Sequence, residues 1–206
     1  MAEHIELLFQ AIEMMVAIGG LIFAIVGIYL PLKKEREREK RTFEAQLEQD
    51  KRAWRMQLLD EQISKYYGPI SAILHEQTTI SERVWEQIGR RKIFENGKDK
   101  LSDLSEDEQL IWKHFVDNYK IPLQRQVVDI MRNNAHLAIR GRDFGAVGTF
   151  LDYALGWEYL DSQMRNGVPN FYEYYYSYNY PAAFNNYIDS TLNMLLDEKQ
   201  DLLESV

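Results

Sequence analysis

The chain has 206 residues and a mass of 24.4 kDa, which is room for one medium domain or a small domain with an appended segment. Hydrophobic residues make up 46% of the sequence and charged residues 27%, so neither a disordered chain nor a fibrous repeat fits. The absence of cysteine excludes disulfides, thiolate metal sites and a cysteine nucleophile, and the net charge of -8 argues against broad binding of duplex nucleic acid.

A long uncharged segment lies near the N-terminus. The 19 residues from Met14 to Leu32 carry no charge and are rich in Ile, Val, Leu and Phe. At about 1.5 Å per residue, a helix of this length covers about 30 Å, the hydrocarbon thickness of a bilayer. We therefore predict one transmembrane helix within residues 1–32. A cleaved signal peptide is the alternative, but acidic residues stand where its basic first region would be.

The charges on the two sides of this segment differ. The charged side chains that precede it are all acidic, whereas six of the nine residues 33–41 are Lys or Arg. Cytoplasmic flanks of membrane helices carry the excess of basic residues. We therefore predict a single-pass membrane protein, with the N-terminus outside and the C-terminal part in the cytoplasm.

One face of the predicted transmembrane helix carries only small or polar side chains. Its members follow one another at alternating steps of three and four residues, which keeps them on one side of a helix. This small-residue stripe consists of Glu6, Gln10, Glu13, Ala17, Gly20, Ala24 and Gly27. Such spacing favours close packing of helices in a homo-oligomer, or, alternatively, the stripe lines a cation pore with Glu13 as its outer ring. The two interpretations merge in an assembly of four or more copies.

Residues 33–67 form a charged segment that we predict to be a stalk helix continuous with the transmembrane helix. Basic and acidic residues alternate, and no Pro or Gly occurs in residues 33–65. The few large apolar residues on one side are Phe43, Leu47, Trp54 and Leu58. They predict a short coiled coil or a buttress against the following domain, whereas a solvated linker helix is the alternative.

Residues 68–206 are predicted to form a cytoplasmic helical domain, so the fold class is all-α. Helical periodicity recurs about five times and no alternating strand pattern occurs. The sequence Tyr66-Tyr67-Gly68-Pro69 predicts a break before a helix that runs to about Gly89. Further helices are expected over residues 123–139, 143–164 and 181–203.

A separate helix is predicted to open at Ser105. Ser105 and Glu108 match a capping box, in which each side chain bonds the backbone N–H of the other residue. Pro122 is expected to interrupt this helix. The apolar residues that recur at helical spacing within it are Leu110, Ile111, Phe115 and Tyr119.

An aromatic tract precedes the last helix. Nine of the 17 residues 171–187 are Phe or Tyr. They predict either packing over the bundle or at an oligomer interface, or a surface on which the bases of a nucleotide or short single strand stack. Arginine clusters could hold the phosphates of such a ligand. The predicted ligand-binding residues are Tyr174, Tyr175, Tyr176, Arg90, Arg91, Arg140 and Arg142.

Motifs for catalysis are missing from the sequence. It contains no Gly-rich phosphate loop ending in Lys-Ser/Thr, no paired-His zinc helix and no Gly-x-Ser-x-Gly elbow. His75 beside Glu76, and His114 with Asp117, lack the further partners that acid–base or metal chemistry needs. We therefore expect that the protein is not an enzyme and that it uses no metal or cofactor.

The layout, with Tyr66-Tyr67-Gly68-Pro69 between the charged segment and the helical domain, resembles the small inner-membrane effectors of bacterial anti-phage defence. Within that group it is similar to the Hailong-type (HalB) membrane effectors, a resemblance that covers the architecture of the whole chain. The resemblance implies an oligomeric ion channel opened by short single-stranded DNA that a partner nucleotidyltransferase makes. It also implies that the small-residue stripe is the pore and that the tyrosines or arginines sense the ligand.

The leading hypothesis is a homo-oligomeric membrane effector of antiviral defence, a tetramer or larger. Its cytoplasmic domain would sense a nucleotide or short single-stranded nucleic acid, and its stalk would couple the domain to a ligand-gated ion channel. The alternative is a membrane-anchored scaffold whose cytoplasmic helical domain recruits a protein partner.

Overall fold

The computed structural model describes the backbone of residues 2–89, 104–141, 144–166 and 180–204, and the side chains of the same residues except 2–12, 28 and 164. Every regular element in these ranges is a helix, which confirms the predicted all-α class. The chain divides into two compact units, Met1–Trp54 and Arg55–Val206.

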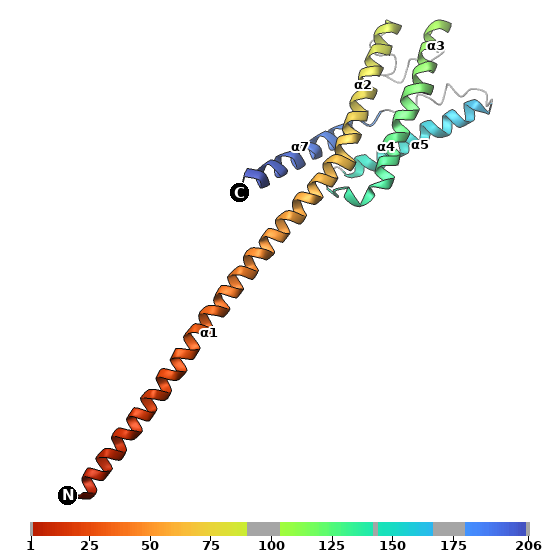
Figure 1. Cartoon of the computed structure of the whole chain (residues 1–206). Coiled ribbons are helices and arrows are strands. Elements are labelled where there is room, and N and C mark those ends of the chain that lie inside the picture. The colour runs from red at the N-terminus through yellow and green to blue at the C-terminus, as the bar shows by residue number, and fades with distance from the viewer. Residues whose placement is uncertain (1, 90–103, 142–143, 167–179, 205–206) are drawn as a thin grey trace. The chain divides into compact units, whose positions relative to one another are not determined.

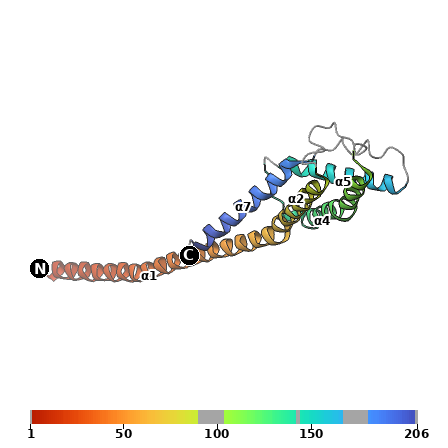
Figure 2. The same ribbon diagram turned by 90° about the horizontal axis from the view of Figure 1, so that it is seen from above.

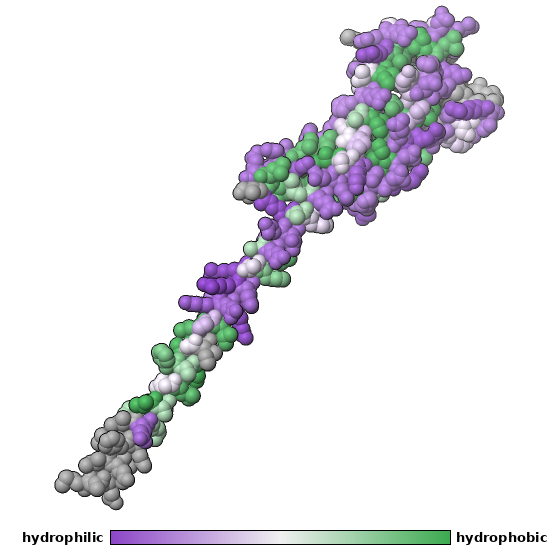
Figure 3. Space-filling view, viewed as in Figure 1, coloured by the Kyte–Doolittle hydropathy of each residue, from purple (hydrophilic) through white to green (hydrophobic). Residues whose placement is uncertain are grey.

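The first unit is the greater part of one long helix, α1, which runs from Ala2 to Gln62. Figure 3 shows a hydrophobic band along this helix followed by a hydrophilic stretch. In the hydrophilic stretch, the ion pairs Lys40–Glu44 (3.8 Å) and Lys51–Glu48 (2.8 Å) join successive turns on the exposed surface. Such pairs add only a few tenths of a kcal/mol each, roughly, so helix propensity carries most of the local stability.

The second unit begins with the last turns of α1, where the expected break at Gly68-Pro69 does not occur. A π-helical turn, η1 (Ile63–Tyr67), leads directly into α2 (Gly68–Ile88). The Gly68 N–H donates to the carbonyl of Ile63, and Pro69, which has no N–H, lies in the first turn of α2. The wider π turn accommodates the proline without a break, and α2 ends as predicted, at the left-handed Gly89.

Gly68 is required by this turn. A Cβ atom on Gly68 would lie 2.5 Å from the carbonyl oxygen of Ile63, which is a backbone atom that cannot rotate away. The same oxygen accepts the Gly68 N–H, so the close approach is part of the π-helical hydrogen bond itself. Only glycine fits at this position.

The predicted capping box is confirmed at the start of α3 (Glu106–Phe115). Ser105 accepts from the Glu108 N–H at 3.3 Å, and the Glu108 carboxylate accepts from the Ser105 N–H at 2.7 Å. The predicted interruption at Pro122 is wrong, because a second π turn, η3 (Val116–Lys120), joins α3 directly to α4 (Ile121–Asn133). Ile121 donates to the carbonyl of Val116, which repeats the arrangement before Pro69.

The helix that was predicted to run to Ile139 ends earlier. α4 stops at Asn133, since Asn134 leaves the helical region with φ −120° and ψ 26°, and a 3-10 turn η4 (Ala135–Leu137) follows. Two further helices of the described residues are α5 (Gly145–Arg165) and α7 (Ala182–Glu204), close to the predicted ranges. Figures 1 and 2 both show α2, α4 and α5 lying together in this unit.

Two hydrophobic cores hold the second unit together. The first core joins η1, α2, α4, α5 and α7, and at its centre the Phe150 and Phe184 rings stack with centroids 4.1 Å apart. The second core joins α2, α3, η3 and α5 and contains Trp112, Phe115 and Trp157. At the edge of the first core, Arg55 makes two hydrogen bonds to the Glu198 carboxylate, and Lys199 pairs with Asp60 at 2.7 Å, so α7 is tied to the last turns of α1.

Candidate functional site

The small-residue stripe lies on α1. Glu13, Ala17, Gly20, Ala24 and Gly27 are exposed, and the regular α-helix places them along one side, as their spacing predicts. Glu6 and Gln10 belong to the same helix, but their side chains lie outside the described residues. Among the residues that the structure describes, one helix near the N-terminus is long and apolar enough to cross a membrane.

The glycines of this segment have no steric role within the chain. A Cβ atom added to Gly19, Gly20 or Gly27 would meet no other atom of the chain within 4 Å. Pro31, also inside α1, cannot donate to the carbonyl of Gly27, so a backbone oxygen on the stripe lacks its helical donor. Packing among the described residues therefore does not require these glycines to be small.

Most of the predicted ligand-binding residues cannot be placed. Tyr174, Tyr175, Tyr176, Arg90, Arg91 and Arg142 lie outside the described residues. Arg140 is described and its side chain is exposed. The members of the aromatic tract that are described pack inward: Phe184 and Tyr187 are buried, and Tyr180 lies edge-on to Tyr153 at 5.5 Å.

Arg140 follows Ile139, whose backbone N–H and carbonyl are both hydrogen-bonded to buried tyrosines. Ile139 donates its N–H to the Tyr67 hydroxyl and accepts from the Tyr187 hydroxyl, both at 2.8 Å, and the two hydroxyls lie 3.1 Å apart. Since Tyr187 gives its proton to Ile139, Tyr67 must donate to Tyr187, which closes a ring of three hydrogen bonds. The backbone beside Arg140 is thus linked to η1, the turn that follows α1.

A buried lysine lies in an aromatic box in the second core. The Lys120 ammonium is 3.4 Å from the ring centroid of Trp157 and 5.5 Å from those of Trp112 and Tyr153. The Lys120 residue is only 8% exposed, and Gln124, one helical turn later, is 1% exposed. Both polar atoms of the Gln124 amide lack a hydrogen-bond partner.

Two opposing effects act on the charge of Lys120. Cation–π attraction to desolvated rings favours the ammonium by about 2 kcal/mol, whereas removing an ammonium from water costs several kcal/mol, on the order of twice as much. Desolvation is therefore the larger effect, and burial lowers the pKa of Lys120 well below its usual value. Burial also raises the pKa of Tyr153, whose ring faces the lysine.

The sequence did not indicate this lysine because the π turn changes the register. In an uninterrupted α-helix, Tyr119 would follow Phe115 on the inner face. The extra residue of η3 instead turns Lys120 inward and leaves Tyr119 39% exposed. The available signal was a lysine two residues before a proline within an apolar helix, but the aromatic partners on α5 come only from the tertiary fold.

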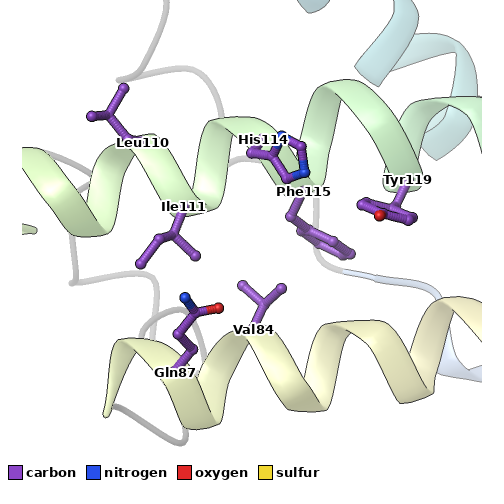
Figure 4. A pocket seen from close by; sticks show the side chains of 7 residues that line it. All are labelled: Val84, Gln87, Leu110, Ile111, His114, Phe115 and Tyr119. Carbon is purple, nitrogen blue, oxygen red and sulfur yellow. The ribbon is translucent and has the colours of Figure 1, made fainter.

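An open groove lies between α2 and α3 (Figure 4) and has a volume of about 300 Å³. Its walls are mostly apolar, with the Gln87 amide and the His114 ring as polar groups. The Asn118 amide donates to His114 Nδ1 at 3.1 Å and to the His114 carbonyl at 2.9 Å, so a neutral His114 carries its proton on Nε2. The residues lining it are Val84, Gln87, Leu110, Ile111, His114, Phe115 and Tyr119.

Within the part of the chain that the structure describes, no three His, Asp or Glu side chains are grouped to hold a metal ion. Comparison with protein-family models, curated proteins and solved structures finds no match for the chain.

Proposed function

We propose that this protein is a homo-oligomeric membrane effector and that α1 forms a ligand-gated ion pore in the bacterial inner membrane. In this proposal the N-terminus is outside, residues 33–67 act as a stalk, and the helical domain is cytoplasmic. The resemblance to Hailong-type effectors suggests antiviral defence as the setting, short single-stranded DNA as the first ligand to test and a nucleotidyltransferase as its source. The protein itself would carry out no reaction.

One observation carries the proposal: the apolar half of α1 is exposed wherever its side chains are described. Every described side chain of residues 13–32 is exposed. An apolar surface of this length in water would cause aggregation, so it needs lipid or other copies of the helix around it. The large side chains suit lipid, while the small-residue stripe suits close contact with neighbouring helices.

The chemistry of the stripe fits a cation pathway. Glu13 is the described charged residue at the outer end of the apolar segment, where a carboxylate is stable only if it faces water or a partner. In an oligomer, one Glu13 per copy would form a ring that concentrates cations. The Gly27 carbonyls, freed by Pro31, would add a ring of oxygens toward the cytoplasmic end.

Coupling between sensor and pore requires a ligand that binds the open arrangement more tightly than the closed one. Arg140 is the described member of the predicted ligand-binding residues, and it adjoins the ring of hydrogen bonds that joins Ile139, Tyr67 and Tyr187. Tyr67 belongs to η1, so a displacement of Ile139 would act directly on the turn that follows α1.

The test is current across a planar bilayer that contains the full-length protein, with and without short single-stranded oligodeoxynucleotides. We expect discrete ligand-dependent openings, and we expect Gly20→Leu to abolish them while insertion and assembly persist. Gly19→Leu is the matched control, because it adds the same side chain one residue away, off the stripe, where the chain also leaves open space. Silence of the wild-type oligomer with every oligonucleotide would favour the scaffold alternative.

A further inference from the structure

The aromatic box around Lys120 contains hydrogen-bond donors from three elements. Lys120 comes from η3, Gln124 from α4, and Tyr153 and Trp157 from α5. Tyr153 joins the group: the Lys120 ammonium lies over its ring, and its hydroxyl faces the Gln124 and Trp157 side chains closely enough to counter part of the effect of burial on its pKa. The ammonium, amide N–H, phenol and indole N–H groups thus converge within one buried cluster.

Among the described protein groups, Lys120 has no counter-charge and the Gln124 amide has no hydrogen-bond partner. No described carboxylate lies within ion-pair distance of Lys120; Asp161, the buried acid of α5, pairs with Arg165 at 3.0 Å. Asp117, on the same π turn, acts weakly on Arg165, and one of its carboxylate oxygens is buried without a hydrogen-bond partner. A protonated Lys120 therefore has no counter-charge there, while a neutral Lys120 still leaves the Gln124 amide unbonded.

A single small anion would meet both needs. It would neutralise the ammonium and accept from the Gln124 amide N–H, whereas a water molecule would bond the amide but leave the charge uncompensated. We propose that Lys120, Gln124 and the Tyr153 hydroxyl form a buried site for one small monovalent anion, such as a halide, and that Lys120 gains a proton when the anion binds.

Proton uptake makes the proposed affinity depend on pH. Burial lowers the pKa of Lys120, so the protonated fraction of the anion-free protein falls as the pH rises. The other described titratable groups that face the cluster are Tyr153 and, behind it, Tyr180 on the α7 side, and the pKa values of both are raised by burial. They stay protonated through the neutral range. Among the described acids on the elements of the box, Asp117 on η3 has a buried carboxylate oxygen and Asp161 on α5 is buried.

The experiment is calorimetric titration of the full-length protein in detergent with sodium bromide, at constant ionic strength set by sodium gluconate, whose anion is much larger than bromide. We expect one bromide bound per chain, uptake of protons on binding, and a Kd that rises with pH. Lys120→Met should abolish this binding. Gln124→Leu should weaken it by about tenfold, because one hydrogen bond to the anion is lost.

Lys113→Met is the matched control, since Lys113 lies on α3 and is exposed, and it should leave bromide binding unchanged. Circular dichroism verifies that each variant keeps its helices. Absence of bromide binding to the wild type, binding that survives in Lys120→Met, or an affinity independent of pH would each overturn the proposal.

Discussion

The two units of this chain differ in whether their apolar side chains are exposed or buried. Every described apolar side chain of residues 13–54 is exposed, whereas the second unit, residues 55–206, buries its aromatic and aliphatic side chains in two cores. A glycine also means different things in the two units: Gly20 has open space around its Cα, and Gly68 has a carbonyl oxygen 2.5 Å from where a Cβ would lie. The described part of the first unit thus leaves its apolar side chains exposed, whereas the second unit is held together by its own packing.

Among the substitutions that distinguish the two units, the largest effect on stability is expected at Phe150. Its ring is fully buried and stacks on Phe184, so Phe150→Ala should lower the free energy of unfolding of the second unit by about 3–5 kcal/mol. Denaturant unfolding of the full-length protein, followed by tryptophan fluorescence, measures this. Phe23→Ala, the same truncation on the exposed part of α1, should leave that transition unchanged; a comparable loss there would contradict the division into two units.

The next effect concerns Lys120 and pH. Because its folded-state pKa is lowered, the unfolded chain binds more protons than the folded one below the usual lysine pKa, so stability should rise with pH from 7 toward 10. Above pH 10 the trend should reverse, since burial raises the pKa of Tyr66 and of Tyr180 to about 12 and the folded state keeps protons that the unfolded state loses.

Lys120→Met separates the contribution of Lys120 to the pH dependence of stability from that of the tyrosines. In gluconate buffer without halide it should stabilise the domain at pH 7 by about 1–4 kcal/mol and remove the rise between pH 7 and 10, because an apolar side chain replaces a buried amine. A destabilised variant, or one that keeps the rise, would show that the ammonium is not the group penalised by burial.

A smaller loss is expected at Gly68. Gly68→Ala forces a Cβ against the Ile63 carbonyl and should cost about 1–3 kcal/mol by distorting η1. Gly20→Ala, in the first unit, should leave the unfolding of the second unit unchanged. Equal stability of Gly68→Ala and the wild type would mean that the π turn relaxes to an ordinary α-helical turn at no cost.

The parts of the fold that local sequence determines were predictable. The capping box at Ser105 and the end of α2 at Gly89 depend on neighbouring residues, and both were found where predicted. The helix breaks predicted at Pro69 and Pro122 were wrong. A proline can be accommodated by a π turn as well as by a break, and which of the two forms depends on packing between distant segments. For the same reason the sequence indicated the small-residue stripe but not the box around Lys120.

The most direct test of the account is whether the small-residue stripe faces the ion path. The chain has no cysteine, so a single cysteine can be introduced without background reaction. We expect a cationic methanethiosulfonate reagent to block ligand-dependent current through Ala24→Cys channels and to leave the current of Ile25→Cys channels intact, since Ile25 is also exposed but lies off the stripe. Equal block of the two, or labelled Ala24→Cys channels that conduct normally, would contradict a pore lined by this stripe.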